Sequence, residues 1–209
     1  NSSNYPSCPG GIPFGCVGVA VSTDGLHWTP APRNPVFSPS ADANTFDAGR
    51  VAVGSVLRWK GQLAMFYFGS ASSQSLGSPT VGLALSSDEG YTWRRVNGTA
   101  GGGAVLRPEA SVEGALSVTQ PHVLVLNSGK LRMYYVALKF DATGMHFMLW
   151  QAESADGVHW GSKQQMRIAS TGSGAGSFGV LQVTPRRLLM FPGWELPGQQ
   201  DAIGVVEGE

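Results

Sequence analysis

The sequence predicts an all-β protein built from repeated four-stranded units, and three observations lead to this prediction. The phrase Ser-x-Asp-Gly-x-x-Trp occurs three times, at residues 22–28, 87–93 and 154–160, with a one-residue variation in the second copy. The closing tryptophans stand 65 residues apart (28 to 93) and then 67 apart (93 to 160). Apolar stretches alternate with turn signals between the copies, without helical periodicity. A fixed period of this length marks a repeat architecture whose unit is one supersecondary motif.

The first complete unit covers residues 46–97 and has the pattern of a four-stranded antiparallel meander. Apolar and β-branched stretches predict strands at residues 51–58, 62–68, 80–86 and 91–96. Lys60-Gly61 is a tight-turn signal between the first two.

The next unit repeats this order, with strands expected at residues 118–126, 131–138, 147–153 and 159–168 and a turn at 127–130. Meanders repeated at this interval are typical of a β-propeller, in which blades pack face to face around an axis and bury faces that one blade alone would expose. A sandwich of two sheets is the alternative.

The strands that precede the phrase divide the chain into blades. They fall at residues 16–22, 80–86 and 148–154, and a fourth version at 202–208 stops where its phrase should begin. We expect the end of a first blade in residues 1–45, a second blade in 46–105, a third in 106–172 and the start of a fourth in 173–209. These make about three and a quarter blades, whereas closed propellers have ~4 to 8. We therefore expect a longer polypeptide or another chain to complete the ring.

The repeated phrase has a structural interpretation. An aspartate at the head of a turn accepts backbone N–H bonds, glycine supplies the positive φ that the reversal needs, and tryptophan buries a large ring against neighbouring strands. We therefore predict turn-forming roles, not catalytic ones, for these residues. They are Asp24, Gly25 and Trp28 in the first copy, Asp88, Gly90 and Trp93 in the second, and Asp156, Gly157 and Trp160 in the third.

Composition excludes several classes of function. Charged residues make up 13% of the chain, and 14 basic residues balance 14 acidic ones, so the electrostatic footprint of a nucleic-acid binder is absent. No apolar run approaches the ~18 residues of a transmembrane helix. Four scattered histidines and two clustered cysteines lack metal-site spacing, and Gly101-Gly102-Gly103 does not continue into a phosphate loop. We expect no metal and no cofactor.

Cys8 and Cys16 flank a loop rich in glycine and proline that would let them meet. A disulfide and a pair of reduced thiols are both compatible with this spacing. Asn1-Ser2-Ser3 and Asn97-Gly98-Thr99 fit the N-glycosylation pattern. Together these features favour an oxidising compartment, either extracytoplasmic or an organelle lumen.

Several motifs resemble those of the five-bladed propellers of the arabinanase, levansucrase and invertase superfamily of glycoside hydrolases (families 43, 68 and 32). They are the stretch at residues 17–28 followed by Asn34-Pro35-Val36-Phe37, Phe46-Asp47 ahead of a blade's first strand, and residues 81–86. The resemblance spans nearly the whole chain and implies five blades with a sugar-binding funnel at the axis. It also implies three carboxylates on the innermost strands, commonly in Asp-Pro or Glu-Pro contexts, because glycosidic cleavage generally takes two carboxylates ~5 to 9.5 Å apart.

The positions that match this pattern carry no carboxylate. They are occupied by Val53 on the first inner strand, Gln120 on the second and Phe178 on the third. Gln120 keeps the following proline but offers an amide, which binds hydroxyl groups and does not act as a general acid. His122 is expected either to line the funnel or to be satisfied within the sheet.

We assign no catalytic residue. Asp47 and Glu113, which lie just before inner strands, are the candidates for an acid pair, and solvated loop carboxylates are the alternative. The sequence favours a non-catalytic, glycosidase-like propeller that acts as a binding or assembly module, docked on a protein partner or in a larger complex, with a glycan as a further possible ligand. The alternatives are an active glycoside hydrolase of arabinanase or fructosidase type with displaced acids, and a carbohydrate-binding lectin.

Overall fold

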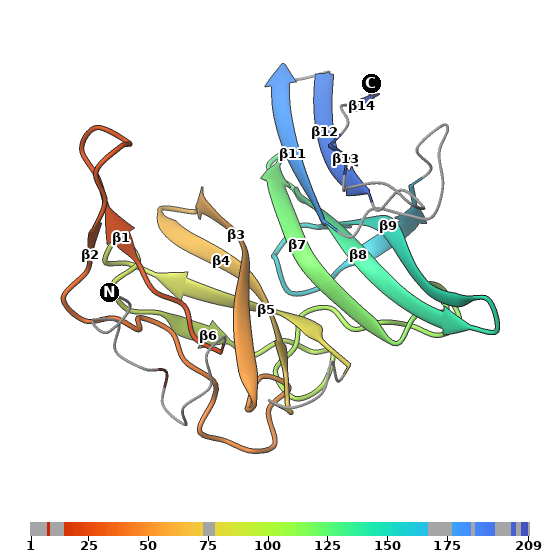
Figure 1. Ribbon diagram of the computed structural model, residues 1–209, viewed down its shortest axis with the longest axis horizontal. Helices are drawn as coiled ribbons and strands as arrows, with labels where there is room; N and C mark the ends of the chain where they lie inside the picture. The colour runs from red at the N-terminus through yellow and green to blue at the C-terminus, as the bar shows by residue number, and fades with distance from the viewer. Residues whose placement is uncertain are drawn as a thin grey trace.

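The computed structural model describes Cys8 and residues 15–72, 78–166, 177–184, 187–194, 202–203 and 206–208, and within them it is all-β and contains no helix (Figure 1). Every strand pairing is antiparallel. Every sheet is built from strands that are neighbours in the chain or nearly so.

The described residues form four sheets that follow one another along the chain. The first pairs β1 (Ala20–Val21) with β2 (Thr29–Pro30). The second runs β3 (Arg50–Trp59), β4 (Gln62–Ser70), β5 (Thr80–Ser86), β6 (Arg94–Val96). The third runs β7 (Ser117–Val125), β8 (Leu131–Asp141), β9 (Gly144–Ser154), β10 (Gly161–Gln165). In the fourth, β11 (Ser177–Thr184) pairs with β12 (Arg187–Trp194), which also pairs with β13 (Ala202–Ile203) and β14 (Val206–Gly208).

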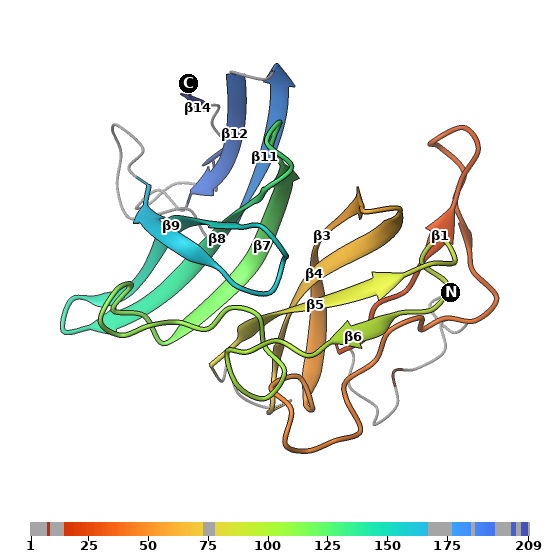
Figure 2. The same ribbon diagram turned by 180° about the vertical axis from the view of Figure 1, so that it is seen from behind.

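These sheets are the blades of a partial propeller, and we call them the first to fourth blades in chain order. β7 contacts β3 of the preceding blade and β11 of the following one. In Figures 1 and 2, β3, β7 and β11 succeed one another beside the open centre of the view, while β6 lies on the outer side of its blade. The predicted all-β propeller is thereby confirmed, with β3, β7 and β11 as its inner strands.

The second strand of each complete blade is apolar on both faces because blades cover it from both sides. Met65 and Phe66 on β4 are both fully buried, although they point to opposite faces of the sheet. Met65 belongs to the core shared with Phe37 and Phe46, whereas Phe66 belongs to the core shared with Tyr135 and Trp150 of the third blade. A buried sheet of this kind gives the near-continuous apolar run seen in the sequence.

The phrase folds into a similar turn in the first three blades. In the second and third blades it joins the third strand to the fourth. In the third copy the Asp156 carboxylate accepts the backbone N–H groups of residues 158 and 159, and the Ser154 hydroxyl accepts that of Gly157. Indole Nε1 of Trp160 donates to the Gly157 carbonyl at 3.0 Å. Gly157 has a φ of 76°, which L side chains rarely adopt. The turn is therefore closed by its own side chains.

The second copy is one residue longer than the other two. Ser86, the last residue of β5, fills the serine position, because its hydroxyl accepts the N–H of Gly90 and donates to Asp88. Glu89 is the additional residue, with a φ of 59°. The longer turn holds residues up to 93, so the strand expected at 91–96 is shortened to β6 at 94–96.

Other strands also differ from expectation at their ends. The strand expected at 159–168 is β10, residues 161–165, and its residues 167 and 168 lie outside the described part of the chain. Only residues 20 and 21 of the stretch 16–22 form a strand, because Val17 makes an isolated bridge to Phe37 instead of joining a sheet.

Trp93 and Trp160 of the phrase pack against the preceding blade. The Trp160 ring meets Phe66 of the second blade edge to face, with centroids 5.7 Å apart. Trp93 packs against the core that contains Phe37. Trp28 is 61% exposed, since no earlier blade covers it within the described residues.

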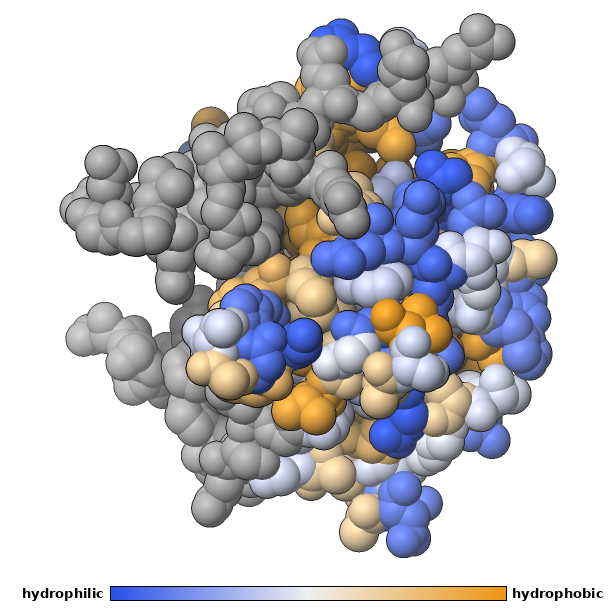
Figure 3. Space-filling view, turned by 90° about the vertical axis from the view of Figure 1, so that its right-hand side faces the viewer, coloured by the Kyte–Doolittle hydropathy of each residue, from blue (hydrophilic) through white to orange (hydrophobic). Residues whose placement is uncertain are grey.

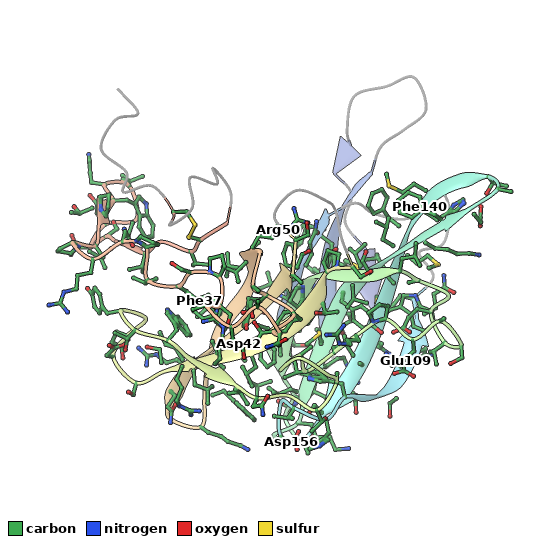
Figure 4. All side chains as sticks on the ribbon, turned by 90° about the horizontal axis from the view of Figure 1, so that it is seen from below. Phe37, Asp42, Arg50, Glu109, Phe140 and Asp156 are labelled. Carbon is green, nitrogen blue, oxygen red and sulfur yellow. A yellow bond between two sulfur atoms is a disulfide. The ribbon has the colours of Figure 1, made fainter. Side chains whose placement is uncertain are left out.

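Cys8 and Cys16 are joined by a disulfide, with 5.8 Å between their Cα atoms. The sulfur bond is visible in Figure 4. Of the two alternatives left open by the sequence, the structure therefore contains the bonded pair.

Candidate binding site

The inner strands of the second and third blades carry matching bulges near the axis. The register of β3 against β4 shifts between Val53 and Ser55, and that of β7 against β8 shifts between Thr119 and His122. Gln120 lies in the second bulge with a φ of 52°. A bulge re-aims side chains locally, and such bulges are common beside functional sites.

The two bulges touch. A Cβ added to Gly54 would lie 2.5 Å from ring carbons and from the carbonyl oxygen of Pro121. The Ser55 hydroxyl accepts the N–H of Val123 at 3.0 Å. Because glycine has no side chain at this point, the backbones of β3 and β7 approach closely and align the starts of the two strands.

A pocket of about 350 Å³ opens beside this contact, between the starts of β3 and β7 and the paired ends of β8 and β9. Its polar lining comes from Arg50, Ser117, Thr119 and Gln120, and no carboxylate lines it within the described part of the chain. The apolar lining consists of Val51, Ala52, Phe68, Pro79, Leu138, Met145 and Phe147. A concave, mostly apolar site with a few convergent polar groups is the usual form of a small-molecule site.

The structure brings some of the residues expected at the axis together. Gln120 lines the pocket, whereas Val53 is an exposed residue that does not. His122 is half-buried, with its ring centroid 6.4 Å from that of Phe178 on β11. Burial lowers the pKa of His122, opposed in part by a hydrogen bond with the Val180 backbone. His122 is therefore a neutral imidazole at pH 7 that joins the third blade to the fourth.

Asp47, one of the two candidate acids, is 1% exposed and is paired within the second blade through one carboxylate oxygen, while its Oδ1 has no hydrogen-bond partner among the described residues. Its Oδ2 accepts the Tyr67 hydroxyl at 2.9 Å and Nε of Arg95 at 2.7 Å. Arg95 also donates to the Ser38 carbonyl and lies over the Phe37 ring, 4.2 Å from its centroid.

Glu113, the other candidate, has a similar environment in the third blade, where it is 4% exposed. Its Oε1 accepts the Tyr135 hydroxyl at 2.9 Å and Nζ of Lys163 at 2.8 Å, and its Oε2 accepts the backbone N–H of Glu109 at 2.8 Å. Lys163 also lies 2.8 Å from the Glu109 carboxylate.

The two clusters are equivalent, and we call each a carboxylate–tyrosine–cation triad. Asp47 and Tyr67 are 20 residues apart and Glu113 and Tyr135 are 22 apart, while the cations follow the carboxylates by 48 and 50 residues. Burial, followed by the nearby carboxylate, raises the pKa of both tyrosines far above the usual range, so both phenols remain protonated donors. The tyrosines and cations were not singled out from the sequence, although their regular spacing is visible there.

The aspartates of the phrase lie elsewhere. Backbone N–H bonds from His27 and His159, together with their side chains, lower the pKa of Asp24 and Asp156 well below the usual range. Hydrogen bonds from the Thr92 backbone and side chain lower the pKa of Asp88. Figure 4 shows Asp156 at one edge of the molecule, away from Arg50 at the start of β3. These carboxylates are ionised turn acceptors and do not face the pocket.

No cluster of three or more His, Cys, Asp or Glu side chains that could hold a metal ion occurs among the residues that the structure describes. In the same part of the chain no helix has the length and apolar character to cross a membrane. On the side of the β8–β9 hairpin, Figure 3 shows apolar residues dispersed among hydrophilic ones.

The fold is that of the propeller glycoside hydrolases. A thermostable family-43 glycoside hydrolase superposes with a TM-score of 0.66 at 14% identity, over 91% of this chain and 60% of that one. An endo-arabinase from Bacteroides thetaiotaomicron superposes with a TM-score of 0.65 at 11% identity, over 92% of this chain and 66% of that one. A sucrose-6-phosphate hydrolase from Lactobacillus gasseri superposes with a TM-score of 0.61 at 18% identity, over 90% of this chain and 36% of that one.

These likenesses define the fold. The chain spans about 60% of the length of the first of these structures. No protein-family model matches the sequence, and no curated protein matches it significantly. The predicted likeness to propeller glycoside hydrolases is confirmed, while the number of blades in the whole ring stays a prediction.

Proposed function

We propose that this chain is a non-catalytic, glycosidase-like propeller that binds a saccharide in the pocket beside the Gly54 and Pro121 contact. The observation that carries the proposal is that none of the described residues lining that pocket has a carboxylate. Cleavage of a glycosidic bond generally needs one carboxyl group as acid and a second as nucleophile or base. The pocket supplies hydroxyl, amide and guanidinium groups instead, which bind but do not perform this chemistry.

The two triads support the same conclusion. Asp47 and Glu113 are buried, each accepts a tyrosine hydroxyl and a cation, and neither lines the pocket. A carboxylate whose partners are internal cannot contact a substrate without breaking those contacts. Their role is therefore structural.

The competing function is an active glycoside hydrolase, like the thermostable family-43 enzyme with a similar fold. The discriminating experiment measures release of reducing sugar by the full-length protein from arabinan, fructan and xylan. We expect none above background. Hydrolysis that Asp47→Asn abolishes while the protein stays folded would overturn the proposal.

Binding is tested by affinity electrophoresis of the protein in gels that contain the same polysaccharides. We expect retardation that Gln120→Ala weakens, because its amide lines the pocket. The matched control is Gln164→Ala on the outer strand β10, whose amide bonds to Gln151 and not to the pocket. If Gln120→Ala and Gln164→Ala are retarded equally, the saccharide binds outside this pocket.

We further propose that the module works within a larger assembly. Exposed apolar residues lie on the inner strands at both sides of the described blades: Val53 and Val56 on β3, and Leu181 and Val183 on β11. Blades cover such faces when they stack. Light scattering is expected to give a particle mass above that of the single chain. The disulfide supports the extracytoplasmic or lumenal location expected from the sequence.

A further inference from the structure

Arg50 is the cation of the pocket. It begins β3, where its backbone pairs with Ser70, and its partly buried side chain lines the cavity. Among the described residues it makes no ion pair. The other partly buried arginines of this part of the chain all have acceptors: Arg95 on Asp47, Arg107 on the Gly101 carbonyl, Arg132 on Glu153. A partly buried guanidinium is most strongly stabilised by an anionic partner.

Ser117 supplies a second group that is free for a ligand. It begins β7, is 1% exposed and lines the same pocket. Its hydroxyl has no hydrogen-bond partner among the described residues. Buried hydroxyl groups are almost always bonded, so the unpaired hydroxyl of a residue that lines a cavity suits a ligand hydroxyl.

We infer that the pocket binds an acidic sugar, a hexuronic acid residue, with its carboxylate on Arg50 and a ring hydroxyl on Ser117. This inference rests on the proposed saccharide-binding function and specifies its ligand. A guanidinium matches a carboxylate through two parallel N–H···O bonds. Phe68 and Phe147 in the lining offer apolar surface to the C–H face of the ring.

Charge balance distinguishes a carboxylate from a phosphate. Of the lining residues that the structure describes, Arg50 alone is basic and none is acidic. One guanidinium balances the single charge of a uronate, whereas a phosphate monoester carries about −1.5 to −2 at pH 7. The volume of about 350 Å³ suits one or two sugar units.

The test is isothermal titration calorimetry of the full-length protein with galacturonic acid and glucuronic acid, beside galactose, glucose, galactose 6-phosphate and acetate. We expect a uronic acid to bind more tightly than its neutral parent sugar, and its affinity to fall as NaCl is raised. Arg50→Gln should weaken uronate binding about tenfold, since a hydrogen-bonded charged pair is lost. Arg50→Lys should recover part of it, because the charge returns without the fork.

The matched control is Arg58→Gln, at the other end of β3, where the side chain pairs with Glu89 in solvent and not with the pocket. It should leave uronate binding unchanged. Circular dichroism and the thermal midpoint establish that each variant is folded.

The outcomes separate the two proposals. Neutral sugars that bind as tightly as the uronic acids or more tightly, or galactose 6-phosphate that binds more tightly than they do, overturn the acidic-sugar assignment and leave saccharide binding intact. Acetate that binds more tightly than the uronic acids also overturns it and limits the site to a bare carboxylate. Uronate binding that Arg50→Gln does not change also overturns it. Hydrolysis of any saccharide overturns the non-catalytic function, and the absence of binding by every sugar overturns both.

Discussion

Replacing Lys163 with methionine should destabilise the protein far more than breaking an ion pair on its surface. The Lys163 side chain is 7% exposed and that of its partner Glu113 is 0% exposed. Methionine keeps most of the length of the side chain and removes the ammonium group. The Glu113 carboxylate then retains only the Tyr135 hydroxyl and the Glu109 N–H as donors.

The magnitude follows from burial. Removing one partner of a buried pair leaves an uncompensated charge and typically costs about 3 to 5 kcal/mol. Domains have free energies of unfolding of about 5 to 15 kcal/mol, so this single change removes a large fraction of the total stability. The control is Arg58→Met, because Arg58 and Glu89 are 69% and 65% exposed, and such pairs contribute about 0 to 1 kcal/mol.

Urea unfolding followed by tryptophan fluorescence measures both variants. Lys163→Met should lower the midpoint strongly, and adding Glu113→Leu to it should recover part of the loss, because the buried charge goes as well. Equal small losses for Lys163→Met and Arg58→Met would refute the conclusion that the triad holds a buried charge. A double variant no more stable than Lys163→Met alone would refute the electrostatic cause of the loss.

Three further predictions concern the axis and the turns. Gly54→Ala should lower the free energy of unfolding in urea by about 1 to 3 kcal/mol, because its Cβ would meet Pro121 at 2.5 Å. The control Gly161→Ala has open space around its Cβ and should be nearly neutral. Similar midpoints for the two variants would contradict the close approach. Asp156→Ala should lower the thermal midpoint by removing a carboxylate that accepts two backbone N–H groups, and an unchanged midpoint would contradict its role in the turn. The pKa of His122 is lowered in the folded state, so the unfolded chain binds a proton first and stability falls as pH drops below about 6.5. His122→Gln should flatten that fall in urea midpoints between pH 7 and 5, and an identical slope would contradict it.

The strands were predictable because each one is bounded by a local signal. Lys60-Gly61 lies between β3 and β4, and the Ser-x-Asp-Gly phrase ends β5 and β9. The misplaced boundaries came from the same phrase, since Glu89 lengthens the second copy and delays β6 to residue 94. An inserted residue with positive φ has no consistent sequence signature outside glycine.

The pocket could be predicted only in part. Gln120 was singled out because it precedes a proline at an inner-strand position. Arg50 and Ser117 were missed, because they come from the starts of two different blades and meet only through the packing of β3 on β7. That packing depends on Gly54 facing Pro121, a pair 67 positions apart that no local pattern connects.

The triads show the limit of assigning chemistry from position. Asp47 and Glu113 were correctly located just before inner strands, and that location made them candidate acids. Their partners lie on β4 and β6 or on β8 and β10, so burial and neutralisation were not visible from the neighbouring residues. The repeated separations of 20 and 22 residues to a tyrosine were the available signal.

Both charges of each triad come from one blade: Asp47 and Arg95 from the second, Glu113 and Lys163 from the third. A gene segment that encodes one blade therefore carries its internal countercharge with it. Duplication of such a segment adds a blade without leaving an orphan charge in the new interface. Each blade therefore holds its own neutral pair, aspartate with arginine in the second and glutamate with lysine in the third.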